Sequence, residues 1–274
     1  MCLIALAWQC HAQYQLVVAG NRDEYYARPS AAAHWWHAGD EVLAGRDLLG
    51  GGTWLGVTRS GRLAGVTNVR EPGALRAAGA PSRGALVTGF LAAHDGAGRF
   101  LEGIAASHGR YAGFNLLVAA GLGSKYAELW VDSNRGAARA EQVAPGIHGL
   151  SNGKFDEPWP KVLSATARLT EILALPAARD AAALCASLLE MLVDERVADD
   201  RDLPQSGVSL ELERGLSPAF IRMPGYGTRA STVVLIGNSG EVHFVERSFV
   251  EGREGTTTQV RFKLADASVS QAAP

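Results

Sequence analysis

The sequence predicts a single α+β domain in which antiparallel sheets pack against layers of helices. Apolar runs bounded by turn residues are typical of strand hairpins, and they occur at both ends of the chain and around residues 60 and 122. Apolar residues at helical spacing occupy two separate blocks, at 83–104 and 160–192. The predicted order is therefore strands, helices, strands, helices, strands. This order lacks the regular strand–helix alternation of a Rossmann fold or a β/α barrel.

Pairs of apolar runs predict three hairpins along the chain. The expected hairpins are 54–58 with 62–68, 114–119 with 126–131, and 231–236 with 242–246, and two further strands are expected at 3–8 and 14–19. A short extended piece is expected at 140–143 and a last strand at 259–264. The cluster Gly50-Gly51-Gly52 leads into a strand, which predicts a turn or a close backbone approach near a site.

Four helices are expected between these hairpins. The first block predicts a helix at 83–94 and a short one around residues 100–104. Pro160 suits the first turn of a third helix, and Asp180 is the predicted N-cap of a fourth. The apolar faces of these last two helices are expected to contain Val162, Leu163, Leu169, Ile172, Leu173, Leu184, Leu188, Leu189 and Leu192. The charged residues that follow predict a long loop at 195–230.

The 274 residues show no internal repeat and no linker. We therefore expect one domain at 1–265 and a flexible C-terminal tail at 266–274. The net charge of -2, from 26 Lys+Arg and 28 Asp+Glu, disfavours a generic nucleic-acid binder. No segment approaches the roughly 20 apolar residues of a membrane span, and no signal peptide is expected. Three cysteines are too few for a disulfide framework, so we expect a cytoplasmic protein with reduced thiols.

Cys2 is the first candidate for chemistry. Removal of Met1 would place a thiol and a free α-amine on one residue. Because an α-amine has a pKa of about 7.7–8.0, it can take the proton of the thiol near neutral pH. One residue would then supply both the nucleophile and the base. The alternative is that Cys2 is a small apolar residue at the start of a strand.

Polar side chains at other strand ends are candidates to act together with Cys2. Asn21-Arg22-Asp23-Glu24 follows the second predicted strand, and a hairpin would bring it beside the start of the chain. Arg22 and Asp23 would then hold the amine and influence the pKa of the thiol. Further strand ends carry the remaining candidates, Asn68, Asn152 and Arg229. A side-chain amide in such a place can donate to an oxyanion, although each of these residues alone is more often part of a turn.

Several motifs resemble the NRDE family, also known as the transport and Golgi organisation family. They run in family order over residues 1–265. The matching segments are the Met-Cys start, Asn21-Arg22-Asp23-Glu24, GGGTWLG at 50–56, TNVR at 67–70, GLSN at 149–152 and YGTRASTVVL at 226–235. The family is in turn similar to N-terminal-nucleophile hydrolases of the choloylglycine hydrolase and penicillin V acylase type. The resemblance implies a four-layer αββα sandwich.

The same resemblance implies roles for the candidate residues. They fall on Cys2 as nucleophile, on Arg22, Asp23 and Arg229 around it, and on Asn68 and Asn152 at the oxyanion. The hydrolases often separate the first arginine and the aspartate by two positions, whereas these are adjacent here. Adjacent residues of an extended strand point to opposite faces. The family has been linked to haem trafficking and to lipid or acyl-coenzyme A metabolism, and the fold alone does not fix the activity.

Other chemistries are disfavoured by the sequence. GLSNG at 149–153 matches the nucleophile elbow of serine hydrolases, but residues 154–160 delay the helix that should follow Ser151. His34 and His37, with Asp40 and Glu41 nearby, lack the spacing of a metal motif, and a surface aromatic loop is expected there. The glycine runs do not form a phosphate-binding loop, and no covalent haem motif occurs. Cys10 and Cys185 are expected to be structural.

Two functional hypotheses follow. The first is an N-terminal-cysteine hydrolase that acts on a linear amide or related acyl bond of a small molecule and needs no cofactor. The second is a non-catalytic protein on the same fold that binds haem, or an acyl lipid or acyl-coenzyme A. A scaffold for protein partners is a third reading, for which the sequence offers no specific patch. The oligomeric state does not follow from the sequence.

Overall fold

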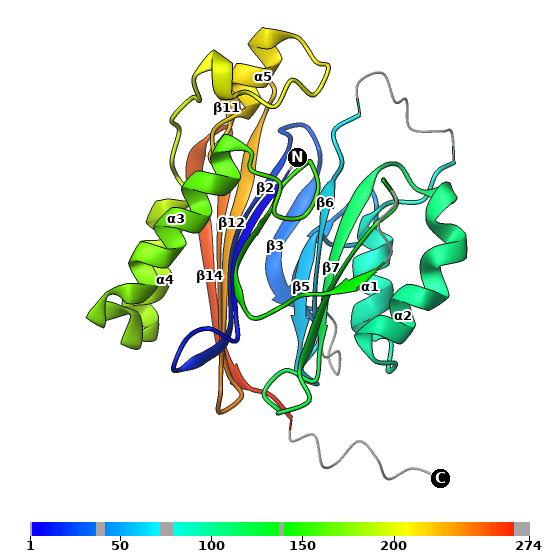
Figure 1. Cartoon of the computed structure of the whole chain (residues 1–274), viewed down its shortest axis with the longest axis vertical. Helices are drawn as coiled ribbons and strands as arrows, with labels where there is room; N and C mark the ends of the chain where they lie inside the picture. Colours follow the sequence, from blue (N-terminus) through cyan, green and yellow to red (C-terminus); the bar gives the residue numbers. More distant parts are fainter. Residues whose placement is uncertain (1, 37–41, 72–78, 137–139, 266–274) are drawn as a thin grey trace.

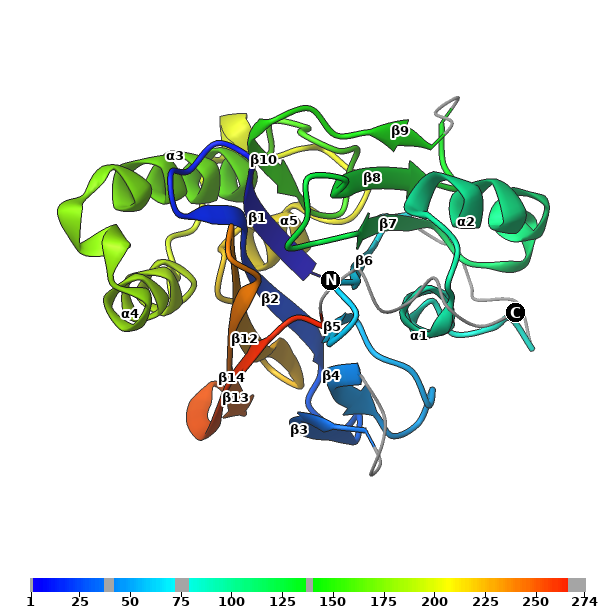
Figure 2. The same ribbon diagram turned by 90° about the horizontal axis from the view of Figure 1, so that it is seen from below.

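The computed structural model describes residues 2–36, 42–71, 79–136 and 140–265. Within them, two antiparallel sheets pack face to face, and helices cover the outer face of each sheet (Figure 1). The view from below shows the same four layers side by side (Figure 2). The fold is therefore a four-layer αββα sandwich, as the family resemblance implied.

The first sheet contains both ends of the described chain. Its order is β10-β1-β2-β12-β13-β14, and β11 also pairs with β12. The strands are β1 (Cys2–Trp8), β2 (Tyr14–Tyr25), β10 (Gly146–Leu150), β11 (Arg222–Met223), β12 (Tyr226–Gly237), β13 (Glu241–Val250) and β14 (Arg253–Lys263). The first strand thus lies inside the sheet, with a neighbour on each side.

The second sheet has the order β3-β4-β5-β6-β7-β8-β9, so every strand pairs with its neighbour in sequence. The strands are β3 (Ser30–Trp35), β4 (Val42–Asp47), β5 (Leu55–Thr58), β6 (Leu63–Asn68), β7 (Phe114–Ala120), β8 (Glu128–Ser133) and β9 (Glu141–Gln142).

The helices form the two outer layers. They are α1 (Gly84–Ala92), α2 (Ala97–Ile104), α3 (Pro160–Ala174), α4 (Ala181–Met191) and α5 (Leu210–Leu216), with 3-10 turns at Ala105–Arg110, Pro176–Arg179 and Asp200–Asp202. Helices α3 and α4 cover the first sheet, and α1 and α2 cover the second (Figures 1 and 2).

Alternation along β1 divides the core into layers. Cys2, Ile4 and Leu6 belong to the cluster between the two sheets, whereas Leu3 and Ala5 pack on the layer of α3 and α4. This is the two-residue periodicity of a strand that is buried on both faces. The N-terminal thiol consequently belongs to the space between the sheets.

The three predicted hairpins are confirmed as the pairs β5–β6, β7–β8 and β12–β13, and the first two predicted strands also pair with each other, as β1–β2. Pro160 begins α3, and the carboxylate of Asp180 accepts a hydrogen bond of 2.8 Å from the Ala183 backbone N–H at the start of α4. The close approach predicted at the glycine cluster is also present, because a Cβ on Gly52 would lie 2.6 Å from the Gly84 carbonyl group. Turns and caps depend on residues close together in the chain, so they can be predicted without knowledge of the fold.

Other expectations were wrong. The polar residues 21–24 lie inside β2, which continues to Tyr25, and the segment 195–230 contains α5, β11 and the start of β12 instead of a long loop. Strands β3, β4 and β10 were not predicted, because their sequences alternate weakly and gain their stability from neighbours in a sheet. Leu163 faces away from the core with 54% of its surface exposed.

The expected tail at 266–274 lies outside the described residues. In the part of the chain that the structure describes, no helix is both long and apolar enough to cross a membrane.

Candidate active site

The fold holds Cys2 at the start of β1. Its direct partner in β2 is Arg22, and β10 pairs with β1 on the opposite side. The Ser151 hydroxyl, just beyond β10, donates a hydrogen bond of 3.0 Å to the Cys2 carbonyl oxygen. Backbone pairing with Arg22 on one side and the Ser151 bond on the other therefore fix the position of this residue, whose exposed fraction is 6%.

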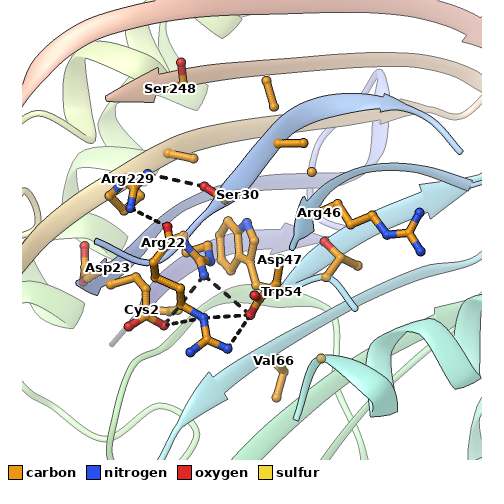
Figure 3. Close-up of a pocket in the computed structure, with 18 of the residues that line it drawn as sticks. Cys2, Arg22, Asp23, Ser30, Arg46, Asp47, Trp54, Val66, Arg229 and Ser248 are labelled. Carbon is orange, nitrogen blue, oxygen red and sulfur yellow. Dashed lines mark hydrogen bonds and ion pairs between the residues drawn. The ribbon is translucent and has the colours of Figure 1, made fainter. Parts of the chain in front are cut away.

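Cys2 opens onto a cavity of about 350 Å³ between the sheets. Both sheets contribute to its wall, and Trp54 and Val66 supply apolar surface (Figure 3). Five of the six predicted site residues line the cavity, namely Cys2, Arg22, Asp23, Asn68 and Arg229. They come from positions more than 200 residues apart in the chain.

Arg22 lies on the same face of the sheet as Cys2, because paired residues of antiparallel strands share a face. Its guanidinium group lies 3.7 Å from the Glu24 carboxylate and 4.0 Å from that of Asp47. Asp47 in turn forms a 2.7 Å ion pair with Arg28 (Figure 3). The buried Nη1 of Arg22 has no hydrogen-bond partner in the described part of the chain. It is thus a donor available to a group bound in the cavity.

Asp23 points to the other face of the sheet, as expected for the residue after Arg22. It is 2% exposed, and it accepts a hydrogen bond of 2.7 Å from the Thr228 hydroxyl. Burial raises the pKa of Asp23, and the charge of Lys161 opposes that rise. Arg22 and Asp23 therefore approach the start of β1 from different faces of the sheet.

The two asparagines adjoin each other. Asn68, at the end of β6, lines the cavity, and its carbonyl oxygen accepts a hydrogen bond of 2.8 Å from Asn152 Nδ2. Asn152 itself is 1% exposed and does not line the cavity. One of its two amide hydrogens is engaged in this bond. The structure thus places Asn152 behind Asn68, at the border of the site.

Arg229 lies at an irregularity in the pairing of β12 with β2. Its Nη1 donates to the carbonyl oxygens of Tyr25, Tyr26 and Arg28 at 2.9–3.0 Å. Its Nη2 reaches the Ser30 hydroxyl at 3.4 Å (Figure 3). The guanidinium group therefore holds the turn after β2, which carries Arg28 to the cavity.

The surroundings of the thiol favour its neutral form. Burial raises the pKa of Cys2, and the charge of Asp23 adds to that effect while that of Arg22 opposes it. A buried neutral thiol is a weak nucleophile and needs a base beside it. The residues that line the cavity include no histidine in the part that the structure describes. The α-amine of a processed Cys2 would supply this base.

Sequence reasoning missed two buried charged groups near the site. Lys161, in the first turn of α3, is 4% exposed and donates from Nζ to the Leu216 carbonyl oxygen at 3.1 Å. Burial lowers the pKa of Lys161 to about 8, although Asp23 opposes that effect. Glu246, on β13, is also 4% exposed and lines the cavity. Both residues resemble surface positions in the sequence, since charged residues are rarely buried.

Asn21 has a structural role. Its side-chain amide donates to the carbonyl oxygens of Leu192 and Ala219 at 2.8 and 2.7 Å, and its Oδ1 accepts from the Ser231 hydroxyl at 2.6 Å. The residue is fully buried. It joins β2 to the segments that follow α4 and precede β11, so only part of the Asn21-Arg22-Asp23-Glu24 motif faces the cavity.

The competing sites are also accounted for. Ser151 is buried and directed at the Cys2 carbonyl group. His34 belongs to β3, with Nδ1 2.8 Å from the Ala32 carbonyl oxygen, so the expected surface loop is partly a strand. His37, Asp40 and Glu41 lie outside the described residues. Among the residues described, no three His, Cys, Asp or Glu side chains group as a metal site would require.

The remaining cysteines differ in their surroundings. Cys185 is buried among apolar residues of α4, as expected for a structural cysteine. Cys10 is exposed, and its thiol donates to the Gly146 carbonyl oxygen at 3.4 Å. Cys10 therefore contacts the backbone of β10 but is not part of the core. Its free thiol offers an internal control for the reactivity of Cys2.

Comparison with known proteins agrees with the motif order. A sequence model of the family described as Transport and Golgi organisation 2 matches residues 1–251. The Transport and Golgi organization protein 2 homolog of Bos taurus is 35% identical over 264 residues, which cover 92% of this chain and 93% of the bovine protein. The homolog of Homo sapiens is 34% identical over 249 residues, covering 87% of this chain and 88% of the human protein.

Among solved structures, the Caenorhabditis elegans N-acylethanolamine-hydrolyzing acid amidase (NAAA) ortholog matches with a TM-score of 0.45 and 11% identity, covering 85% of this chain and 92% of that one. The family model spans every motif from Cys2 to Leu235, and the mammalian relatives align over most of their length. The chain therefore belongs to the Transport and Golgi organisation 2 family.

Proposed function

We propose that the chain is an N-terminal-cysteine hydrolase that cleaves a linear amide or related acyl bond after removal of Met1. The observation that carries this proposal is the placement of Cys2. The thiol at the second position of the chain lies at the start of a paired strand and lines a cavity with Arg22, Asp23, Asn68 and Arg229. A cysteine with a purely structural role would not need these polar side chains around it.

In the proposed reaction, Cys2 Sγ attacks the substrate carbonyl carbon while the α-amine takes the thiol proton. Asn68 stabilises the oxyanion with its side-chain amide, and Asn152 holds Asn68 in position through the bond to its carbonyl oxygen. The C–N bond breaks, and the leaving amine takes the proton back from the ammonium group. Water then adds to the thioester and releases the carboxylic acid and the thiol. Asp23 holds the α-ammonium group, and Arg22 binds the part of the substrate next to the carbonyl.

The test combines the natural N-terminus with an acyl probe. Mass spectrometry should find Cys2 as the first residue of the working protein, and p-nitrophenyl octanoate should give a burst of one nitrophenolate per chain. Cys2→Ala should abolish the burst, and Cys10→Ala should leave it unchanged. A version with an N-terminal extension provides the matched control, because it keeps the thiol but converts the amine to an amide. Full activity of that version, or of protein that retains Met1, would disprove the mechanism.

A second candidate is binding without turnover, of haem or of an acyl lipid or acyl-coenzyme A. The observation that favours it is the arginine content of the cavity wall, which is lined by Arg22, Arg28, Arg46, Arg83 and Arg229. Guanidinium groups are suited to phosphates and carboxylates. Cys2 is the described lining residue whose side chain suits haem iron.

Cys2→Ala separates the two candidates. Hydrolysis requires the thiol, whereas retention of a phosphate-bearing ligand by arginines does not. We expect that palmitoyl-coenzyme A would raise the melting temperature of Cys2→Ala as much as that of the unaltered protein if binding is the function. Absence of any shift with palmitoyl-coenzyme A or haem, together with a thiol-dependent burst, would eliminate this candidate.

A further inference from the structure

Glu246 is a buried carboxylate that the proposed reaction does not use. It lies on β13, lines the same cavity as Cys2 and is 4% exposed. Its Oε1 accepts a hydrogen bond of 2.6 Å from the Ala33 backbone N–H, and its Oε2 accepts one of 3.2 Å from the Thr232 hydroxyl. Both donors are neutral. Among the described residues, no Lys, Arg or His nitrogen lies within ion-pair distance of this carboxylate.

The carboxylate keeps acceptor capacity toward the cavity. An ionised carboxylate offers about four lone-pair sites, and the two donors described above occupy two of them. Gly45, on the facing sheet, also lines the cavity. A Cβ at Gly45 would lie 3.3 and 3.4 Å from the two carboxylate oxygens. The absence of a side chain there therefore keeps a Cβ from packing against the two oxygens.

The electrostatics of this position favour a positively charged ligand. Burial raises the pKa of Glu246, and the hydrogen bonds from Ala33 and Thr232 together with the charges of Arg22 and His34 offset that rise only in part. The acidic groups near Cys2 differ, since Asp47 and Glu24 already face Arg28 and Arg22. A buried charge of this kind is stabilised when a ligand brings an opposite charge with hydrogen-bond donors.

Strand pairing gives the distance of this group from β1, the strand that carries the nucleophile. Glu246 pairs with Thr232, which pairs with Gly20, which pairs with Ile4 of β1. Three strand spacings of about 4.8 Å place Glu246 roughly 14 Å across the sheet from β1. Trp54 covers the row between them, because a Cβ on Gly20 would lie 3.1 Å from Trp54 Cη2.

We infer that Glu246 is a specificity-determining residue that binds a protonated amine carried by the substrate, at the far end of a chain that extends from Cys2 past Trp54. The inference rests on the proposed function, since it assigns the substrate class of the same site. It predicts an acyl group with a terminal ammonium group in place of a plain hydrocarbon end.

The structural alternative is that Glu246 only connects β13 to Ala33 of β3. Glu246→Gln distinguishes the two roles, because the amide oxygen keeps an acceptor for that N–H but removes the charge. Gly45→Ala is a second variant, which places a methyl group against the carboxylate without changing the charge. Glu190→Gln, at an exposed position of α4, removes a carboxylate elsewhere and serves as the control.

The experiment compares two electrophiles of equal length, N-(8-aminooctyl)-2-chloroacetamide and N-(8-hydroxyoctyl)-2-chloroacetamide. Alkylation of Cys2 is followed by peptide mass spectrometry in a Cys10→Ala background. We expect the ammonium probe to react about tenfold faster, the effect of one charge-assisted hydrogen bond. Glu246→Gln and Gly45→Ala should bring the ratio close to one, and Glu190→Gln should leave it unchanged. Equal rates in the unaltered protein, or a preference that survives in Glu246→Gln, would overturn the inference.

A second measurement keeps this inference separate from the proposed function. If neither probe alkylates Cys2, the nucleophile assignment fails, and binding at Glu246 is then read directly. In a Cys2→Ala background, n-octylammonium should raise the melting temperature more than 1-octanol does, and Glu246→Gln should abolish the difference. An equal effect of the two compounds would overturn the role of Glu246 whatever the chemistry of Cys2.

Discussion

The Ser151 hydroxyl donates a hydrogen bond of 3.0 Å to the carbonyl oxygen of Cys2, although 149 positions separate the two residues. The bond joins the end of β10 to the first residue of β1. Ser151 lies in a sequence that resembles a nucleophile elbow, but its hydroxyl is used to hold Cys2, the candidate nucleophile.

Ser151→Ala should remove this bond and loosen the start of β1. We expect a loss of about 1 kcal/mol in the free energy of unfolding, the usual net worth of one hydrogen bond. Alkylation of Cys2 should slow, while that of the exposed Cys10 should not change. A fluorophosphonate should fail to label the unaltered protein at Ser151. Labelling at this serine would contradict the assignment.

The reactivity of Cys2 should depend on whether its amine is free. Burial raises the pKa of the thiol above its ordinary value of 9.0, so thiolate is lost as the pH falls through that raised pKa. In protein with Met1 or an N-terminal extension, the rate of alkylation by iodoacetamide should still be rising at pH 9. In processed protein, the rate should level off near pH 8, where the α-amine loses its proton. Identical profiles for the two forms would exclude the amine as the base.

Lys161 should couple stability to pH. Its pKa falls from 10.5 in the unfolded chain to about 8 in the folded protein, so the folded state binds fewer protons between these values. The cost of burying the charged lysine is complete below pH 8 and is relieved as the pH rises toward 10.5.

Relative to Lys161→Met, the unaltered protein should therefore gain about 3 kcal/mol of unfolding free energy between pH 8 and 10.5, at 1.36 kcal/mol for each unit of pKa. Urea unfolding of both proteins at several pH values measures this difference. A difference that stays constant over the range would show that the lysine titrates normally.

Arg70 and Glu213 form the buried ion pair that attaches α5 to the site. Arg70 Nη1 lies 2.7 Å from Glu213 Oε2, and the two side chains are 6% and 4% exposed. Arg70→Met should cost about 3–5 kcal/mol in urea unfolding, because Glu213 would remain buried without its cationic partner. Adding Glu213→Leu should recover most of that loss. If the double variant is as unstable as the sum of its single variants, the pair does not act as a unit.

Much of the fold could be predicted from local sequence. The hairpins, the proline at the start of α3 and the Asp180 cap depend on residues close together in the chain, and they are confirmed. Strands β3 and β4 escaped prediction because their stability comes from partners in the sheet. The segment 195–230 was expected to be a loop because its charges suggested solvent, whereas the Arg70–Glu213 pair buries some of them.

The sequence by itself pointed to the family and to the six candidate residues, because motif order is a property of the linear chain, and the αββα architecture followed from the family resemblance. The tertiary structure alone decided how those residues meet. It placed Cys2 and Arg22 on one face, Asp23 on the other, and Asn152 behind Asn68. It also showed that Lys161 and Glu246 are buried. Burial and the packing of the two sheets depend on residues that are distant in sequence. The sequence of a charged residue is the same whether its side chain lies at the surface or in a cavity.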